Sequence, residues 1–395
     1  MLPLSEKVQN IVESNTVKLA ETYRKMRKEG KDVISLIIGE PDLPVPSYIK
    51  DATIQAIQED KTNYSEVPGL TSLREGIANI SNSTTNAITK DHVFLANGSK
   101  QSLFLIFQAI CNRGDEVIIP RPFWVTFPES VKLSGANPVF ANCLADFTPD
   151  AKEIKSLIGT KTKAIILNYP NNPSGAIPSK DSIQDLLKVC ISKDIYLIID
   201  EAYNDLVYSK SAKIDSISLW NQYPEHVIIT RSFSKSFSMT GFRIGYTITS
   251  LKLAKAFNKL QSHICGNIST FSQFGALKAI EGKLYTKELD TRQKYFIAKR
   301  DRMFALAKGT FDSLTCPPGG LFLFPNVKKF FNEEITNDID LTLYLLEKAN
   351  VAIVPGSAFG LEDHLRISFA ASDHDIDVGI ERINNALSSL LTGEK

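Results

Sequence analysis

Short apolar runs rich in β-branched residues alternate with helical patterns between His92 and Thr249. Strand length and bounding turn residues are found in HVFLA, DEVIIP, TKAIIL, IYLIID and HVIIT. Strands that alternate with helices favour parallel pairing, because each helix can carry the chain back across the sheet. Continuous apolar strands also indicate that both faces of the sheet are covered. We therefore predict an α/β fold with a mostly parallel sheet sandwiched by helices.

After Leu251 the chain becomes mainly helical, and a long amphipathic pattern runs from about Thr286 to Lys308. Further strands are expected at 319–327, 351–356 and 364–370, with helices at 338–349 and 373–391. This pattern predicts a smaller α+β domain, which the N-terminal segment joins. The predicted divisions are 1–44 for an arm and part of the small domain, 45–290 for the large domain, and 291–395 for the small C-terminal domain. Within the arm, a helix is expected from Thr16 to Lys28.

The overall composition excludes several classes of function. The 395 residues include 45 basic and 44 acidic side chains, so no basic field points to nucleic acid. Five scattered cysteines contain no CxxC pair, and His263 with Cys265 is too small a set for a metal site. The N-terminus lacks the pattern of a signal peptide, and no apolar run approaches the roughly 20 residues of a membrane span. We expect a cytoplasmic protein without a metal, nucleic-acid or membrane partner.

The stretch SFSKSFSMTGFRIG, Ser232 to Gly245, places one lysine, Lys235, between two predicted strands. A lysine held in such a turn can form a Schiff base if its surroundings lower its pKa. The neighbouring hydroxyl groups and Arg243 suit a phosphate group. The alternative is a solvated loop lysine without a chemical role.

Other polar residues follow the predicted strands, and ligands of open parallel sheets bind beyond the carboxyl ends of the strands. In NGSK, Ser99 and Lys100 begin a helix, where free N–H groups favour a phosphate. A plain glycine turn with a serine cap remains the alternative. Trp124 follows the next strand and could stack on a flat ligand or simply belong to the core.

Three further strand ends carry candidate groups. In NYPNNPSG, Asn172 can present its amide from a fixed turn. Asp200 ends a buried strand, where a carboxylate needs a cation such as a protonated ring nitrogen or an arginine, and Tyr203 can donate to a ligand oxygen. Arg366, in a predicted strand of the smaller domain, can clamp a carboxylate or extend to the surface. Together these groups suit pyridoxal phosphate, which uses a lysine Schiff base and an acidic partner for its ring nitrogen.

The order of the motifs resembles that of the class I aminotransferases, which are fold-type I pyridoxal phosphate enzymes. The likeness covers essentially the whole chain and is greatest to the branch with many bacterial aspartate aminotransferases. It rests on GEPD, the Tyr64 loop, GSKQ, GDEVIIPRPFW, NYPNNPSG, DEAY, SFSKSFSMTGFRIG, VPGSAFG and LRISFA. Departures are mild: serine replaces threonine in NPSG, phenylalanine replaces the frequent tyrosine before Trp124, and Ser99 stands where alanine or glycine is common.

The resemblance implies a role for each matching residue. Lys235 would bond to the cofactor and then move the proton, Asp200 would keep the ring nitrogen protonated, and Tyr203 would hydrogen-bond the phenolic oxygen. The remaining implied contacts are stacking of Trp124 on the ring; phosphate binding by Ser99, Lys100, Ser232 and Arg243; a phosphate contact from Tyr64 of the neighbouring subunit in a homodimer; hydrogen bonding of Asn172 to the phenolic oxygen; and binding of the substrate carboxylate by Arg366, Asn172 and the backbone near Gly39.

The expected activity is therefore a ping-pong transamination from an L-amino acid to a 2-oxo acid such as 2-oxoglutarate. Aspartate is the commonest donor in the family, and aromatic amino acids, kynurenine, methionine or prephenate remain open. One alternative is a pyridoxal phosphate C–S β-lyase of the same fold. Another is a non-catalytic regulatory module, although such regulators usually carry an added DNA-binding domain.

Overall fold

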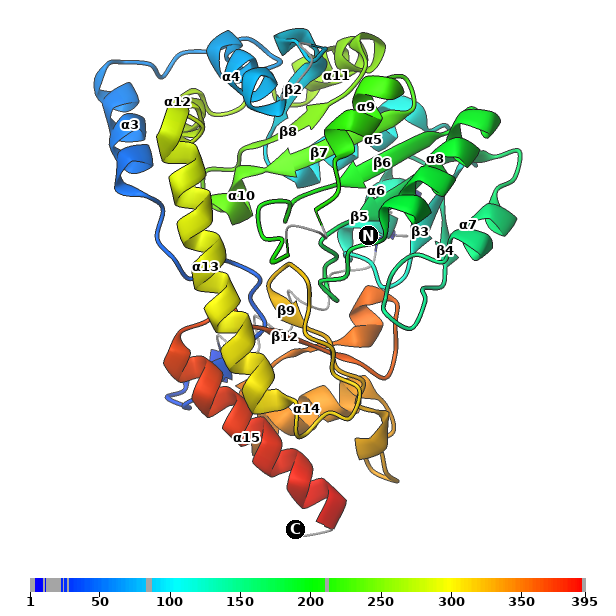
Figure 1. Ribbon diagram of the computed structural model, residues 1–395, viewed down its shortest axis with the longest axis vertical. Coiled ribbons are helices and arrows are strands. Elements are labelled where there is room, and N and C mark those ends of the chain that lie inside the picture. Colours follow the sequence, from blue (N-terminus) through cyan, green and yellow to red (C-terminus); the bar gives the residue numbers. More distant parts are fainter. Residues whose placement is uncertain are drawn as a thin grey trace.

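The computed structural model describes residues 4–9, 11, 23, 25, 26, 28–82, 87–209 and 213–392. Most of the helix predicted from Thr16 to Lys28 lies outside the described residues. The described residues form a large α/β part and a smaller part, and the long helix α13 runs between them (Figure 1).

A seven-stranded sheet of order β2-β8-β7-β6-β5-β3-β4 organises the large part. β8 is antiparallel to both of its neighbours, and the other neighbouring pairs are parallel. The prediction of a mostly parallel sheet is therefore confirmed. The strands are β2 (Val93–Ala96), β3 (Glu116–Pro120), β4 (Asn137–Ala141), β5 (Thr162–Asn168), β6 (Tyr196–Asp200), β7 (Val227–Ser232) and β8 (Gly245–Ile248).

Helices cover both faces of this sheet because alternate strand residues point to opposite sides. Ile165 and Leu197 face one hydrophobic core, while Ile166 and Ile198 face another. The first core includes residues of α3 (Ser47–Gln58), α4 (Thr71–Ser81), α7 (Ala151–Leu157), α8 (Lys180–Lys193), α9 (Ser216–Gln222) and α12 (Thr270–Ala279). The second includes residues of α5 (Ser99–Ile110), α6 (Thr126–Leu133) and α11 (Leu251–Ile264).

The smaller part combines segments from both ends of the chain. β1 (Ile34–Ser35) pairs in parallel with β10 (Val351–Ala352), and three antiparallel strands have the order β11-β12-β9. These strands are β9 (Phe322–Leu323), β11 (Val354–Pro355) and β12 (Leu365–Ser368), and the accompanying helices are α13 (Gly282–Ala307), α14 (Asp338–Lys348) and α15 (Asp373–Thr392). Short elements are α1 (Glu6–Gln9), α10 (Phe233–Ser236), η1 (Lys90–His92), η3 (Lys328–Phe330) and η4 (Gly356–Phe359). The predicted α+β character of this part is confirmed, whereas the divisions at 44/45 and 290/291 stay predictions.

The strands predicted at 319–327, 351–356 and 364–370 were longer than the observed strands β9 to β12. The apolar segment from Asp32 to Gly39 contributes only β1 to a sheet. The physical reason is that the carbonyls of residues 37, 38 and 39 accept hydrogen bonds from the side chains of Arg366, Ser368 and Lys235. These carbonyls are directed toward the site described below.

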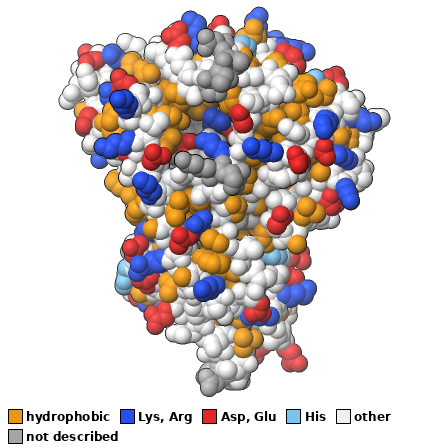
Figure 2. All heavy atoms as spheres, viewed as in Figure 1, with side chains coloured by type: hydrophobic (Ala, Val, Ile, Leu, Met, Phe, Trp, Pro, Cys, Tyr) orange, Lys and Arg blue, Asp and Glu red, His pale blue; other side chains and the backbone are white. Residues whose placement is uncertain are grey.

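The surface of the described residues agrees with the near-neutral composition. Acidic and basic side chains are interspersed over the face in Figure 2 rather than gathered by sign. None of the helices in the described ranges has the length and apolar character that crossing a membrane requires.

Candidate active site

A cavity of about 550 Å³ lies where the sheet meets the smaller part. Most of its lining residues follow the carboxyl ends of β2, β3, β5, β6 and β7. Because β8 runs in the opposite direction, the residues that precede it lie at the same edge of the sheet. The structure brings together eleven of the predicted site residues here: Gly39, Ser99, Lys100, Trp124, Asn172, Asp200, Tyr203, Ser232, Lys235, Arg243 and Arg366. The twelfth, Tyr64, is 97% exposed and does not line the cavity.

Lys235 lies on α10, a single helical turn directly after β7. Its Nζ donates a hydrogen bond of 2.7 Å to the carbonyl oxygen of Gly39. Burial lowers the pKa of Lys235 to about 8, with the nearby Glu40 acting in the opposite direction and Arg366 reinforcing the shift. About a tenth of the amine is therefore uncharged at pH 7, far more than for an ordinary lysine, and the uncharged form is the one that acts as a nucleophile or proton acceptor.

Asp200 is buried at the end of β6 and faces the cavity. Within the described part of the chain, its carboxylate accepts one hydrogen bond, from the backbone N–H of Ala202 at 3.0 Å. Burial raises the pKa of Asp200 to about 7, and the charge of Glu201 contributes in the same direction. A buried carboxylate with so little support fits a ligand that brings its own N–H⁺ group.

The start of α5 offers the features that bind an anion, namely positive charge and free N–H donors. Gly98, with φ of 78°, precedes α5, and a Cβ atom on it would lie 2.6 Å from Nη2 of Arg243. A Cβ on Gly245 would lie 2.6 Å from the backbone nitrogen of Ser99. These glycines let Arg243 approach the start of the helix, where free N–H groups and the helix dipole favour an anion. Burial, and then the charge of Arg243, lowers the pKa of Lys100.

Arg366 enters the cavity from β12 in the smaller part and is only 6% exposed. Its Nη1 donates to Oδ1 of Asn172 at 3.0 Å, and its Nη2 donates to the carbonyl of residue 37 at 2.6 Å. The rings of Phe322 and Phe359 lie 4.3 and 4.8 Å from its Cζ. Burial lowers the pKa of Arg366 to about 10, while Tyr203 opposes the shift. The guanidinium is thus held in a fixed orientation and lacks a carboxylate partner among the described residues.

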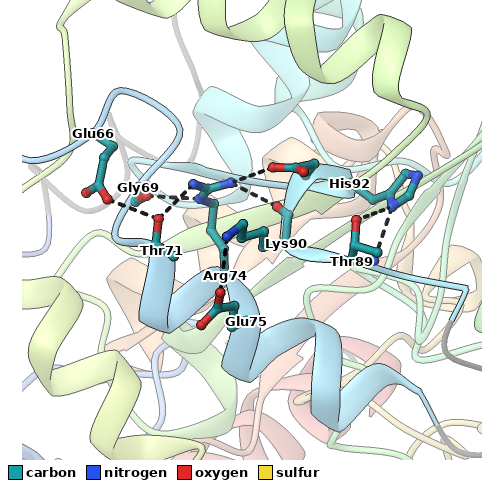
Figure 3. Close-up of polar contacts among 9 residues, drawn as sticks. Glu66, Gly69, Thr71, Arg74, Glu75, Thr89, Lys90 and His92 are labelled. Atoms are coloured by element: carbon teal, nitrogen blue, oxygen red, sulfur yellow. Dashed lines mark hydrogen bonds and ion pairs between the residues drawn. The ribbon is translucent and has the colours of Figure 1, made fainter.

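The loop that carries Tyr64 is held firmly although Tyr64 itself is exposed. Buried Arg74 donates to the carbonyls of Gly69 and Lys90, and Thr71 donates to Glu66 (Figure 3). On the other side of the loop, the buried side chain of Gln273 bonds to Leu70 N at 2.7 Å and to Ser65 Oγ at 3.1 Å. The carbonyls of Asn63 and Val67 accept from Thr270 and Gln261. An ordered loop therefore presents one aromatic side chain outward.

Comparison with known proteins assigns this geometry to a family. The sequence model described as aminotransferase class I and II matches residues 31–383. The aspartate aminotransferase of Bacillus subtilis is 35% identical over 387 residues, covering 97% of this chain and 98% of that protein. The chain belongs to the class I and II aminotransferases.

Other class I and II aminotransferases extend the comparison. The bifunctional aspartate aminotransferase and glutamate/aspartate-prephenate aminotransferase of Petunia hybrida is 32% identical over 98% of this chain and 84% of its own length. The structure of Thermus thermophilus aspartate aminotransferase with maleate superposes with a TM-score of 0.91, at 30% identity over 98% of this chain and all of that one. The predicted fold-type I architecture and aminotransferase activity are confirmed.

Enzymes of this family depend on pyridoxal 5′-phosphate, and the described residues fit that group. The weakly supported carboxylate of Asp200 matches a protonated ring nitrogen, and the cradle of Gly98, Gly245 and Arg243 matches a phosphate. Lys235 lies in the same cavity with an amine of lowered pKa. The chemistry of this donor set therefore agrees with the cofactor that the family uses.

Sequence reasoning missed several residues of the cavity. Phe322 packs on Arg366, and Glu40 accepts a hydrogen bond from Thr240. Glu40 belongs to the quoted motif GEPD, so the sequence already indicated that this residue could lie at the site. Phe322 offered no comparable signal, because one phenylalanine in an apolar run is ordinarily a core residue.

Proposed function

We propose that this aminotransferase transfers the amino group of an acidic, aspartate-like L-amino acid to a 2-oxo acid such as 2-oxoglutarate. The observation that carries the proposal is that one cavity holds both the partly buried amine of Lys235, whose pKa is lowered, and the buried, weakly supported carboxylate of Asp200. Such strongly shifted groups in a cleft are typical of catalytic sites.

The residues that would hold pyridoxal phosphate are those of the cavity lining to which the family resemblance gives a role. Asp200 would pair with the ring nitrogen, Trp124 would stack on the ring, and Asn172 and Tyr203 would donate to the phenolic oxygen. Ser99, Lys100, Ser232 and Arg243 would bind the phosphate. When bound, the cofactor supplies an aldehyde that bonds to amines and a ring that withdraws electrons from the substrate's α-carbon.

The remaining steps belong to the chain's own residues. Arg366 would bind the α-carboxylate of the substrate through its planar guanidinium, with Asn172 and the backbone at Gly39 beside it. Nζ of Lys235 would accept the proton that leaves the α-carbon, since its pKa near 8 suits proton transfer close to neutral pH. Two successive half-reactions at one site give ping-pong kinetics.

The charge of the cavity supports an acidic substrate. Among the described lining residues, Lys100, Lys235, Arg243 and Arg366 are basic, whereas Glu40 and Asp200 are acidic. This excess of positive charge favours anionic ligands. Maleate, the dicarboxylate present with the Thermus thermophilus relative, has that character.

We further propose a homodimer in which Tyr64 reaches the phosphate of the partner subunit's cofactor. Its exposure on an ordered loop supports this role, because an isolated subunit leaves the side chain without any burial. A cytoplasmic location, suggested by cysteines dispersed along the chain, remains part of the same proposal.

The test is a panel of amino donors, followed spectroscopically, first without and then with 2-oxoglutarate. Aspartate or glutamate should convert the bound cofactor once and then stop until the 2-oxo acid is added. Continued turnover of a donor without any 2-oxo acid would instead indicate a lyase. Full activity of Lys235→Ala would contradict the proposal outright.

A further inference from the structure

The segment that follows β6 contacts the lysine turn on two sides. Tyr203 of this segment, like Asp200 at the end of β6, lines the large cavity together with Lys235. Asp205, in contrast, lines a second, small cavity together with Ser236. The same segment that presents groups to the active site therefore also borders the other side of the turn that carries the lysine.

A direct hydrogen bond joins these two segments next to Lys235. Oγ of Ser236, a buried residue, donates at 2.7 Å to Oδ2 of Asp205, which is partly buried. The other oxygen of Asp205 is 3.4 Å from Nδ2 of Asn204. Of these two hydrogen bonds to the carboxylate of Asp205, the one from the Ser236 hydroxyl is therefore the shorter.

The residue on the other side of Lys235 is also held by a hydroxyl group. Oγ of Ser232 lies 2.8 Å from Oγ of Ser234 and accepts from the Ser234 backbone N–H at 3.1 Å. Ser232 borders the anion-binding end of the large cavity. The two serines that flank the lysine are therefore tied to different supports, one on each side.

The turn depends on these side-chain hydrogen bonds because its own backbone contributes few hydrogen bonds. α10 has four residues, and the N–H of Phe237 closes its one full helical turn on the carbonyl of Phe233 at 3.1 Å. An ion pair between Arg231 and the buried carboxylate of Glu201, with 2.7 Å between Nε and Oε2, holds the preceding end of β7. Isolated single turns are not stable by themselves, so side chains decide how this one is oriented.

We propose that Asp205, acting through Ser236, is a positioning residue that keeps the amine of Lys235 directed at the reacting atoms. Since Ser236 is adjacent to Lys235, a rotation of the turn that breaks its hydrogen bond to Asp205 also moves Nζ away from the carbonyl of Gly39. The inference rests on the proposed function, because it assumes that Lys235 is the reacting amine. Neither Asp205 nor Ser236 lines the large cavity, so neither touches substrate.

The test compares variants of the full-length protein that differ in one hydroxyl group. Ser236→Ala removes the hydrogen bond, and Ser236→Thr retains the hydroxyl while its methyl group can enter the small cavity. Ser218→Ala is the matched control, because Ser218 makes a similar 2.6 Å hydrogen bond to Asp215 at the exposed start of α9. Asp205→Ala, which removes the acceptor of this hydrogen bond, serves if Ser236→Ala does not fold.

Two measurements separate positioning from general stability. The first is the rate at which visible absorbance develops when pyridoxal phosphate is added and bonds to the protein. The second is the separation of kcat from KM for the amino donor. For Ser236→Ala we expect the rate of bonding and kcat to fall by about tenfold or more, with KM little changed, since small misplacements of reacting groups have effects of this size. Ser236→Thr should recover most of both losses, and Ser218→Ala should match the unmodified protein.

A Lys235→Ala background provides the decisive control. If Ser236 acts through the lysine, adding Ser236→Ala to Lys235→Ala should leave the noncovalent affinity for pyridoxal phosphate unchanged. A further loss of affinity in that background, or normal bonding and kcat in Ser236→Ala, would overturn the inference while leaving the proposed function intact. If the unmodified protein develops no visible absorbance with pyridoxal phosphate, the proposed function fails and this inference fails with it.

Discussion

Replacing Asp200 by asparagine should change how the stability of the cofactor-free protein depends on pH. The folded-state pKa of Asp200 is raised to about 7 from an ordinary value of 3.8, mainly by burial. Between these values the folded protein retains a proton that the unfolded chain has released. Stability therefore falls as pH rises through this interval, because the unfolded state binds fewer protons than the folded state.

The size of the effect follows from the shift. One unit of pKa corresponds to about 1.4 kcal/mol, so a shift of about three units destabilises the folded protein by about 4 kcal/mol at pH values above 7. Of this, about 3 kcal/mol develops between about pH 5 and about pH 8. An asparagine side chain cannot ionise, so Asp200→Asn should remove this part of the pH dependence.

The assay is urea unfolding of the cofactor-free protein at pH 5 and pH 8, with Asp200→Asn compared against the unmodified chain. Asp60→Asn is the matched control, because Asp60 is exposed and adopts a φ of 56°, which asparagine tolerates. Asp200→Asn should gain about 3 kcal/mol relative to the unmodified chain on going from pH 5 to pH 8. Pyridoxal phosphate should then stabilise the unmodified chain more than the variant at pH 8, since a protonated ring nitrogen compensates only a carboxylate.

An equal pH dependence in both proteins would refute the reasoning. It would mean that Asp200 already has a cation or ordered donors in the cofactor-free state, so that its ionisation costs nothing.

Three other outcomes are expected. Arg366→Lys should lower kcat/KM for the amino donor roughly 10- to 100-fold, because lysine cannot reproduce hydrogen bonds from two guanidinium nitrogens. Initial rates measure this ratio, and an unchanged value would show that Arg366 does not bind the substrate. Mixing inactive Lys235→Ala subunits with impaired Tyr64→Phe subunits should restore activity above that of either alone, and failure after verified subunit exchange would contradict a Tyr64 contact across the interface. Gln273→Leu should lower the free energy of unfolding by about 1–3 kcal/mol because it leaves the N–H of Leu70 without its partner, and a denaturant midpoint equal to that of the unmodified protein would show that water replaces the amide.

The composition of the cavity was predictable because its residues follow strand ends that the sequence makes visible. Asp200 directly ends an apolar strand, and Lys235 follows the next one. In a parallel sheet, such residues must meet at one edge. Arg366 lies far away in the chain, and its predicted place in the cavity came from the family resemblance and not from strand order.

The supporting contacts were not predictable from local patterns. Gln273 bonds to Ser65 across more than half of the chain, and Ser236 bonds to Asp205 from another segment. Side-chain pairs of this kind leave no periodicity in the sequence, and each partner looks like an ordinary polar residue. The strand lengths of the smaller part were also less predictable. Its apolar runs show which residues are buried, but a strand continues only where backbone carbonyls bond to a neighbouring strand, and two carbonyls here bond to side chains instead.

The pairing of β1 with β10 has a consequence for biosynthesis. All strands of the seven-stranded sheet lie between residues 93 and 248, so that sheet can assemble while the last third of the chain is still on the ribosome. Residues 34 and 35 emerge before that sheet, yet their partners, residues 351 and 352, emerge long after it. Among the described residues, the first strand to be synthesised is therefore one of the last to be paired, and the smaller part can be completed only after the large sheet has formed.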